Sequence, residues 1–411
     1  MTDKIERSAT RVRGFENNEM DFQLLRQLGA GAYGGSSAGE CFHAVSLMKD
    51  ETPEEWVRAF ADLGERQVED AARRKSRGHG ISARDQYLKA SNSFRAAEYY
   101  TFVDSPEHRE LGIKSRNAFI AAMDFARHTF ETVEIPFEDM TLPAYFMAPD
   151  GSRGKRKTKV MISGFDGTME ETYFQGGHAA IERGYNLMLL AGPGQMDTLR
   201  FFPERRFRPD FEKPVAAALD WLLKRPDVDH SLVALQGISF GGYFSIRAGC
   251  HDERIRALIP NAAILNLHSY IVSMAGFDAA EMTDSEDVTA EMLAGDVPDL
   301  PAAQRELARA IIARFGKPTL KKTFQYLKEF RVTPDDLGRI RCPSLALVGV
   351  GEGGAAAKDC ETFCKSVSGP SAKYVFTREE GADSHCQFGN LSFGAAVVYD
   401  WLDDLFSNVA R

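Results

Sequence analysis

The chain contains a serine whose sequence context is typical of an enzymatic nucleophile. Ser239 lies in LVALQGISFGGYFSIRAG, residues 232–249, between Gly237 and Gly241 in a G-x-S-x-G pattern. An apolar, strand-like run precedes the serine and a helix-compatible run follows it, as a nucleophile elbow requires. The two glycines allow the backbone to approach closely at such a turn. This context favours a nucleophile over the alternative, a glycine-rich turn without chemistry.

A serine hydroxyl needs a base, and the base needs an acid to orient it. In enzymes built on this elbow the acid and then the histidine follow the nucleophile along the chain. His385 is the last of the nine histidines and lies in the loop ADSHCQ, after the strand-like run AKYVFTREEG. A lone histidine is more often structural, but its order and its place in a loop favour His385 as the base.

Several carboxylates follow the serine and could orient this base. Glu352 lies in GVGEGG, directly after the apolar run PSLALVGV, and we favour it as the acid. Asp359 is its rival, although it falls within the expected next helix. Asp383 is only two residues from the histidine, and Glu379 and Glu380 lie within or just after the last strand-like run. The structural alternative for Glu352 is a solvated turn carboxylate.

An oxyanion hole needs two backbone donors beside the nucleophile. We expect one from Phe240 and one from Phe165 or Asp166, in the loop SGFDGTMEE after the run KVMISGF. Thr168 and Glu171 in the same loop resemble a capping box. A carboxylate at Asp166 is unusual beside an oxyanion unless it is protonated, binds substrate or transfers a proton. The alternative is an ordinary Asp-Gly turn, and spacing alone does not choose.

Composition limits the class of protein. The chain has 411 residues, 44% hydrophobic and 27% charged, with a formal net charge of -9. It is long enough for two or more structural units, and no apolar run is long enough to cross a bilayer. The acidic balance disfavours a nucleic-acid partner. The first residues, MTDKIERSATRVRGFENN, lack the apolar segment of a secretory signal, so we expect a cytoplasmic protein without membrane contact.

The six cysteines are scattered without a paired framework, so we predict no structural disulfide. Cys360 and Cys364 are four residues apart, but no further ligands follow at metal-site spacing, so helix packing is the better interpretation. We expect no metal and no cofactor.

The hydrophobic pattern divides the chain. Residues 1–130 show helical periodicity, with a helix start indicated at Ser82, and predict an all-helical N-terminal cap domain. Residues 131–411 begin with an antiparallel hairpin and continue with short apolar runs that alternate with helical stretches. This alternation predicts an α/β fold with a mostly parallel, doubly wound sheet. Between Ala263 and Pro343 helical stretches replace the alternation, so we predict a helical lid insertion at about residues 266–338.

Together these segments resemble a known family. The order SGFDGTMEE, LLAGPGQ, RPDFEKPVAAALDWLLKRPDVD, LQGISFGGYFSIRAG and GADSHCQFGNL, preceded by YLKASNSFRAAEYY, resembles the α/β-hydrolases. The similar members include 2,6-dihydroxypseudooxynicotine hydrolase and fungal polyketide-shortening hydrolases, and more distantly the fermentation-respiration switch protein. The resemblance runs from about residue 80 to the C-terminus.

The resemblance implies a helical domain packed over the catalytic face, a substrate buried between the two, and a homodimer. It places the nucleophile, acid and histidine at Ser239, Glu352 and His385. Members that cleave carbon–carbon bonds next to a ketone also use an acidic residue at the position of Asp166. Two features depart from the pyridine-cleaving relative: Glu352 replaces an aspartate, and the insertion is longer.

We therefore predict a cofactor-independent serine hydrolase that cleaves a carbon–carbon bond in a β-diketone or aryl ketone. The alternatives are an ester, lactone or amide hydrolase with the same residues, an acyl-transfer or cyclisation enzyme, and a non-catalytic regulatory binding protein. In each enzymatic case the partner is a small ketone or ester substrate.

Overall fold

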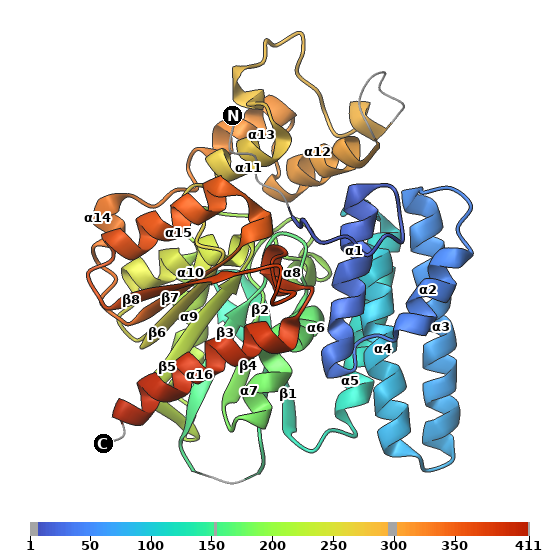
Figure 1. Ribbon diagram of the computed structural model, residues 1–411, viewed down its shortest axis with the longest axis horizontal. Coiled ribbons are helices and arrows are strands. Elements are labelled where there is room, and N and C mark those ends of the chain that lie inside the picture. The colour runs from blue at the N-terminus through green and yellow to red at the C-terminus, as the bar shows by residue number, and fades with distance from the viewer. Residues whose placement is uncertain (1–6, 152–153, 295–301, 410–411) are drawn as a thin grey trace.

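A central eight-stranded sheet organises the protein (Figure 1), whose computed structural model describes residues 7–151, 154–294 and 302–409. The strand order is β1-β2-β4-β3-β5-β6-β7-β8. β1 and β2 form the predicted antiparallel hairpin, β2 pairs antiparallel with β4, and the remaining neighbours are parallel. The strands are β1 Thr129–Phe137, β2 Met140–Ala148, β3 Arg156–Ile162, β4 Asn186–Leu190, β5 Val228–Ile238, β6 Ala257–Asn261, β7 Ser344–Gly349 and β8 Ser371–Phe376.

Both faces of the sheet are buried, because helices cover each of them. On one face Val160 and Ile162 of β3 join the core formed with α9 (Glu212–Leu222), α10 (Phe240–His251) and α15 (Gly354–Ser366). On the other face Met161 packs in the core that contains α7 (His178–Glu182) and α16 (Leu391–Val409). Alternation of side chains along each strand explains why neighbouring apolar residues enter different cores. The predicted doubly wound, mostly parallel sheet is confirmed.

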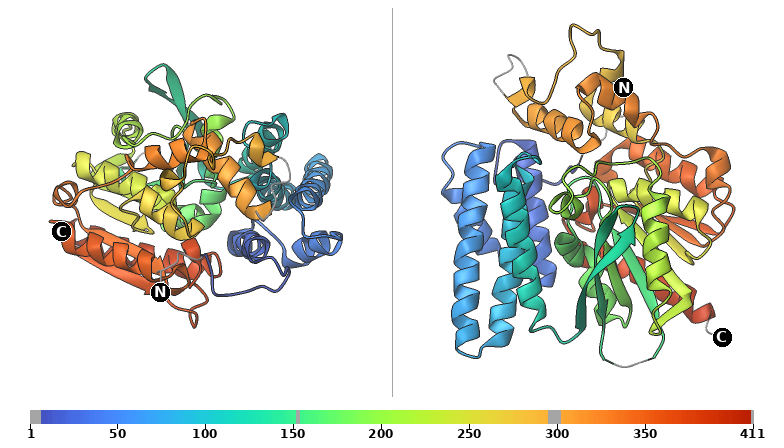
Figure 2. Two further views of the ribbon diagram at one scale, coloured as in Figure 1. Left: turned by 90° about the horizontal axis from the view of Figure 1, so that it is seen from above. Right: turned by 180° about the vertical axis from the view of Figure 1, so that it is seen from behind.

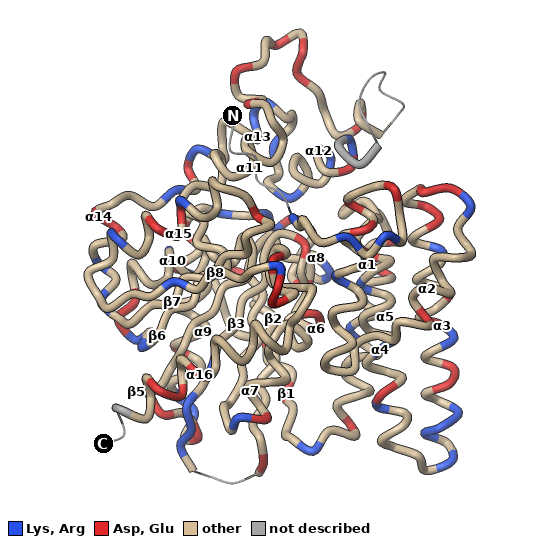
Figure 3. The backbone as a smooth tube through the Cα atoms, in the orientation of Figure 1, with Lys and Arg blue, Asp and Glu red and all other residues tan. Residues whose placement is uncertain are grey.

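Five α-helices precede the sheet and stand beside it (Figure 1, blue to cyan). They are α1 Asn18–Gly29, α2 Ala38–Ser46, α3 Pro53–Ser76, α4 Gly80–Tyr99 and α5 Pro106–Met123. Thr52 and Ser105 begin α3 and α5, since each side chain accepts a backbone N–H three residues on. The helix start indicated at Ser82 is wrong: α4 begins two residues earlier, after His79, without a side-chain cap. Lys and Arg alternate with Asp and Glu along α3 (Figure 3).

A helical segment also fills the interval between β6 and β7. It contains α11 (Leu267–Ala275), α12 (Ala302–Phe315), α13 (Leu320–Leu327) and α14 (Pro334–Leu337). Residues 295–301 of the predicted insertion lie outside the described residues. α11, α12 and α13 form a layer above the sheet and the N-terminal helices in Figure 1, and the reverse view in Figure 2 shows the same arrangement. Within the described residues, no helix is long and apolar enough to cross a membrane.

Candidate active site

Ser239 lies on a sharp turn between β5 and α10. Its backbone has φ 59° and ψ -125°, a strained conformation for a residue with a side chain. The turn requires glycine on both sides. A Cβ on Gly237 would lie 1.7 Å from the carbonyl oxygen of Gly241, and one on Gly241 would lie 2.5 Å from that of Ile162. The G-x-S-x-G pattern therefore corresponds to a close backbone approach that holds the serine at the end of its strand.

The structure brings Ser239, His385 and Glu352 into one hydrogen-bonded line. His385 Nε2 lies 2.9 Å from Ser239 Oγ, and His385 Nδ1 lies 2.5 Å from Glu352 Oε2. Glu352 is fully buried in the turn after β7, where its Oε1 also accepts the backbone N–H of Gly349. A hydroxyl, an imidazole and a carboxylate in this order are the groups of a serine-hydrolase triad.

The rival carboxylates lie elsewhere. Asp359 is inside α15 and accepts the backbone N–H of Leu265 at 3.4 Å. Asp383 accepts a hydrogen bond from the Thr10 hydroxyl at 2.7 Å. Glu380 accepts from the Tyr374 hydroxyl beside the last strand. Of the carboxylates considered from the sequence, the structure places only Glu352 against the histidine.

His385 is almost completely buried beside its acid. Burial alone would lower the pKa of this imidazole, but the neighbouring ionisable groups Cys386, Tyr270 and Glu352 together raise the pKa of His385 well above its ordinary value. The carboxylate makes the imidazolium more stable. An imidazole that readily takes a proton is suited to accept one from the serine hydroxyl.

Phe165 and Phe240, the residues expected to form the oxyanion hole, line the pocket together with Ser239. Phe240 is the first residue of α10, and the amides in the first turn of a helix have no partner inside it. The loop after β3 lies directly against this turn, since a Cβ on Gly164 would be 2.6 Å from Ser239 Cβ and 2.8 Å from the Phe240 nitrogen. Phe165 follows in that loop, and its ring centroid is 5.3 Å from that of Phe240. The two expected donors thus come from adjacent loops.

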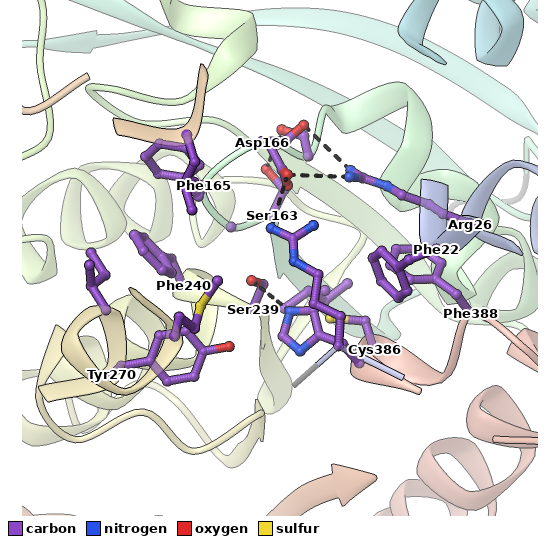
Figure 4. A pocket seen from close by; sticks show the side chains of 18 of the residues that line it. Phe22, Arg26, Ser163, Phe165, Asp166, Ser239, Phe240, Tyr270, Cys386 and Phe388 are labelled. Carbon is purple, nitrogen blue, oxygen red and sulfur yellow. Dashed lines mark hydrogen bonds and ion pairs between the residues drawn. The ribbon is translucent and has the colours of Figure 1, made fainter. Parts of the chain in front are cut away.

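Asp166 lines the same pocket and is ion-paired. Its Oδ2 lies 3.3 Å from Arg26 Nη1 and 3.9 Å from Arg7 Nη2 (Figure 4). Burial would raise the pKa of Asp166, but Arg26 and then Arg7 reverse the effect and hold the pKa well below its ordinary range. Of the three explanations considered from the sequence, a protonated carboxyl is excluded by these charges. An ionised carboxylate is also a poor proton donor.

Sequence reasoning missed the arginine that controls this carboxylate. Arg26 of α1 also pairs with Glu171, at 2.5 Å from Nη2 to Oε2. The proposed capping box is therefore half wrong: Thr168 accepts the backbone N–H of Glu171, but the glutamate side chain turns to Arg26 instead of back to the helix start. Phe22 and Arg26 are four residues apart on α1 and both face the pocket. The sequence signal that could have identified Arg26 is its place on the apolar side of a helix.

The pocket above Ser239 is mostly apolar, and the space between its walls, open solvent included, is about 750 Å³. Side chains of α11, α12, α1 and the loop after β8 form its walls (Figure 4). Its apolar lining includes Phe22, Phe165, Ile238, Phe240, Tyr270, Ile271, Met274, Leu307, Ile311 and Phe388. A concave site with a mostly apolar lining suits a small organic molecule.

The residues before α1 form part of this wall. We call residues 7–16 the N-terminal strap. The carbonyl oxygen of Arg7 accepts the backbone N–H of His385 at 2.6 Å, and the Thr10 hydroxyl donates to Asp383 two residues away. The strap thus holds the loop that carries the histidine, a contact that no local pattern indicated.

All six cysteines are free, and Cys360 and Cys364 lie on α15. The described residues contain no cluster of three or more His, Cys, Asp or Glu that could bind a metal.

Known proteins with similar sequences are fungal hydrolases. The alpha/beta hydrolase xenA of Xenoacremonium sinensis is 32% identical over 371 residues, which cover 84% of each chain. The 20-hydroxy-prefusarin hydrolase FUS2 of Gibberella moniliformis is 28% identical over 96% of this chain and 98% of its own. No family model matches the sequence.

A solved structure shares the fold. The crystal structure of 2,6-dihydroxy-pseudo-oxynicotine hydrolase aligns with a TM-score of 0.70 at 20% identity, over 92% of this chain and 95% of that one. The sheet order, the turn at Ser239 and these similarities define the class: the chain belongs to the α/β-hydrolase family. Within that family the predicted resemblance to fungal hydrolases and to the pseudo-oxynicotine enzyme is confirmed.

Proposed function

We propose that this hydrolase cleaves a carbon–carbon bond next to a ketone in a β-diketone or aryl ketone, through an acyl-enzyme on Ser239. The hydrogen-bonded line from Ser239 through His385 to Glu352, inside an apolar pocket, is the observation that carries the proposal. The fold likeness to 2,6-dihydroxy-pseudo-oxynicotine hydrolase supports the same scaffold, and the names of the fungal relatives support hydrolysis.

The reaction begins when Ser239 Oγ adds to the ketone carbonyl carbon and its proton passes to His385 Nε2. The amides of Phe240 and Phe165 stabilise the resulting oxyanion. As the carbonyl re-forms, the bond to the α-carbon breaks and its electron pair leaves as an enolate, which His385 protonates. Water, deprotonated by the same imidazole, then hydrolyses the acyl-serine and restores Ser239. Glu352 holds the imidazole in the required orientation throughout.

Asp166 has a binding role in this proposal. Its charge is fixed by Arg26 and Arg7, so His385, and not Asp166, returns the proton to the departing carbon. The carboxylate accepts a hydrogen bond from the enol of the substrate, an interaction that a simple ester lacks.

The experiment compares two substrates in three proteins. Benzoylacetone reports carbon–carbon cleavage through the acids and ketones formed, and 4-nitrophenyl acetate reports ester hydrolysis. Ser239→Ala should abolish both reactions. Asp166→Asn should lower cleavage of the diketone by about ten- to a hundredfold and spare the ester, as expected for one lost charged hydrogen bond. Equal retention of both activities in Asp166→Asn would favour an ester hydrolase, and absence of Ser239 labelling by a fluorophosphonate would favour a binding protein.

A further inference from the structure

Arg314 on the lid helix α12 faces a second cavity that adjoins the Ser239 pocket. The side chain is 3% exposed, and it lines the space between α12, the N-terminal strap and the end of α4. The two cavities adjoin, because several residues line both. The shared residues are Arg7, Phe22, Phe165, Asp166, Met274 and Leu307.

The guanidinium of Arg314 uses only part of its hydrogen-bonding capacity. Nη2 donates to the carbonyl oxygen of Gly194 at 2.8 Å, Nη1 contacts the sulfur of Met196, and Nε has no partner. One face lies over the ring of Phe165, with 4.7 Å between the guanidinium carbon and the ring centroid. A guanidinium carries five N–H donors, so several remain for a ligand.

Arg314 differs from the other buried arginines because no carboxylate accompanies it. Arg26 pairs with Asp166 and Glu171, and Arg200 pairs with three acidic groups. Among the residues that the structure describes, no carboxylate oxygen lies within 4.0 Å of Arg314. A buried cation without a counter-charge is costly.

The charge of Arg314 persists nevertheless. Burial lowers the pKa of Arg314 to about 10, and the attraction of Asp166 limits the decrease. At neutral pH the guanidinium is therefore protonated. Asp166 itself does not compete for the open donors, because Arg26 and Arg7 hold its carboxylate.

We propose that Arg314 binds an anionic oxygen group on the substrate, a carboxylate or the enolate of an acidic dicarbonyl, at the end remote from Ser239. The proposal rests on the proposed function for the orientation of the substrate but names a separate subsite. A planar fork of N–H donors on a side chain that is itself buried fits two oxygens of one anion. The ring of Phe165 connects this subsite to the oxyanion hole, since Phe165 contributes its amide to one and its ring to the other.

Equilibrium binding separates this proposal from the proposed chemistry. Isothermal titration of Ser239→Ala protein with 3-phenylpropanoate and with the neutral 3-phenylpropanamide measures the preference for a negative charge without turnover. We expect the carboxylate to bind about ten- to a hundredfold more tightly than the amide, the range for hydrogen bonds to a charged group. Arg314→Met in the same background should abolish this preference, and Arg314→Lys should restore part of it.

Arg309→Met is the matched control, because Arg309 lies on the same helix and already pairs with Glu306. It should keep the preference for the carboxylate. A carboxylate that binds no more tightly than the amide, including no binding of either, overturns the proposal, as does a preference that survives Arg314→Met. Since no step of catalysis is measured, failure of the proposed reaction leaves this outcome unaffected.

Discussion

Charged groups are arranged differently on the two sides of the active site. On the side of the sheet, one carboxylate, one imidazole and one hydroxyl form a line in which Glu352 is the carboxylate that contacts His385. On the side of the N-terminal helices, arginines and carboxylates form dense buried pairs, such as Arg26 with Glu171 and Arg200 with Glu98. The first arrangement is suited to moving a proton along a short path, whereas the second fixes helices to the α/β unit.

This contrast predicts different consequences of mutation. Buried pairs that lose one partner leave an uncompensated charge, so substitutions on the helical side should lower stability first. Substitutions in the hydrogen-bonded line should lower the rate with little loss of stability.

The largest expected effect is that of Glu352→Gln. Without the carboxylate the imidazole loses its orientation and the stabilisation of its protonated form, so kcat should fall by about 10³- to 10⁴-fold. Asp359→Asn, the conservative change at the rival position, should leave kcat near that of the unchanged protein. Steady-state kinetics with a 4-nitrophenyl ester measure both. A similar loss in the two variants would mean that the acid was assigned incorrectly.

Arg200→Met should have the next largest effect, on stability. Arg200 is fully buried and contacts Glu98 of α4 at 2.9 Å and Glu170 and Asp197 at 3.1 Å. Its removal leaves these carboxyl groups without their cation, at a cost of about 3–5 kcal/mol in the free energy of unfolding. Urea denaturation measures the loss. Arg247→Met breaks a pair with Glu212 in which each side chain is 16% exposed, so it should cost less. Equal losses in the two variants would contradict the comparison.

The pH dependence of kcat/KM tests the hydrogen-bonded line of Ser239, His385 and Glu352. In the proposed mechanism the neutral form of His385 is the base, and its pKa lies above the ordinary value. Log kcat/KM should therefore rise with pH, about tenfold per unit below that pKa, and level off above it. In Glu352→Gln the midpoint should move to lower pH, since one favourable charge is gone. A midpoint below the ordinary histidine value in the unchanged protein would contradict this account.

Thr10→Val should produce the smallest effect. The valine removes the hydroxyl that donates to Asp383, two residues before His385. A lost hydrogen bond of this kind is worth about 1–2 kcal/mol, so we expect kcat/KM to fall by roughly fivefold. Thr10→Ser keeps the hydroxyl and should behave like the unchanged protein. Unaltered kinetics in Thr10→Val would show that the N-terminal strap does not position the histidine loop.

The sheet and its catalytic loops were predictable because their signals are local. Apolar runs predicted the strands. Because Ser239, Glu352 and His385 each follow such a run, all three were expected at the carboxyl ends of the strands. The arginines were not predictable in the same way. Arg26 pairs with Asp166 and Glu171, which lie far along the chain, and Arg7 contacts Asp166 as well as the nearer Glu19. Nothing in the sequence around either arginine indicates the contact with Asp166.

Helix boundaries show the same limit. The sequence placed the start of α4 at Ser82 because serine is a good N-cap residue. In the structure the helix begins at Gly80. The side chain of Glu171 likewise follows its ion pair with Arg26 instead of the local capping pattern. At Glu171 a tertiary contact thus outweighs a local preference worth only about 1 kcal/mol.

The contact between Arg7 and His385 joins residues near opposite ends of the chain. Ribosomes add roughly 5 to 20 residues per second, so His385 emerges on the order of a minute or less after Arg7. The N-terminal helices can form during that interval, but the N-terminal strap cannot yet contact the loop that carries His385. The pocket therefore cannot be completed, and hydrolysis cannot begin, before the segment that carries His385 has been synthesised.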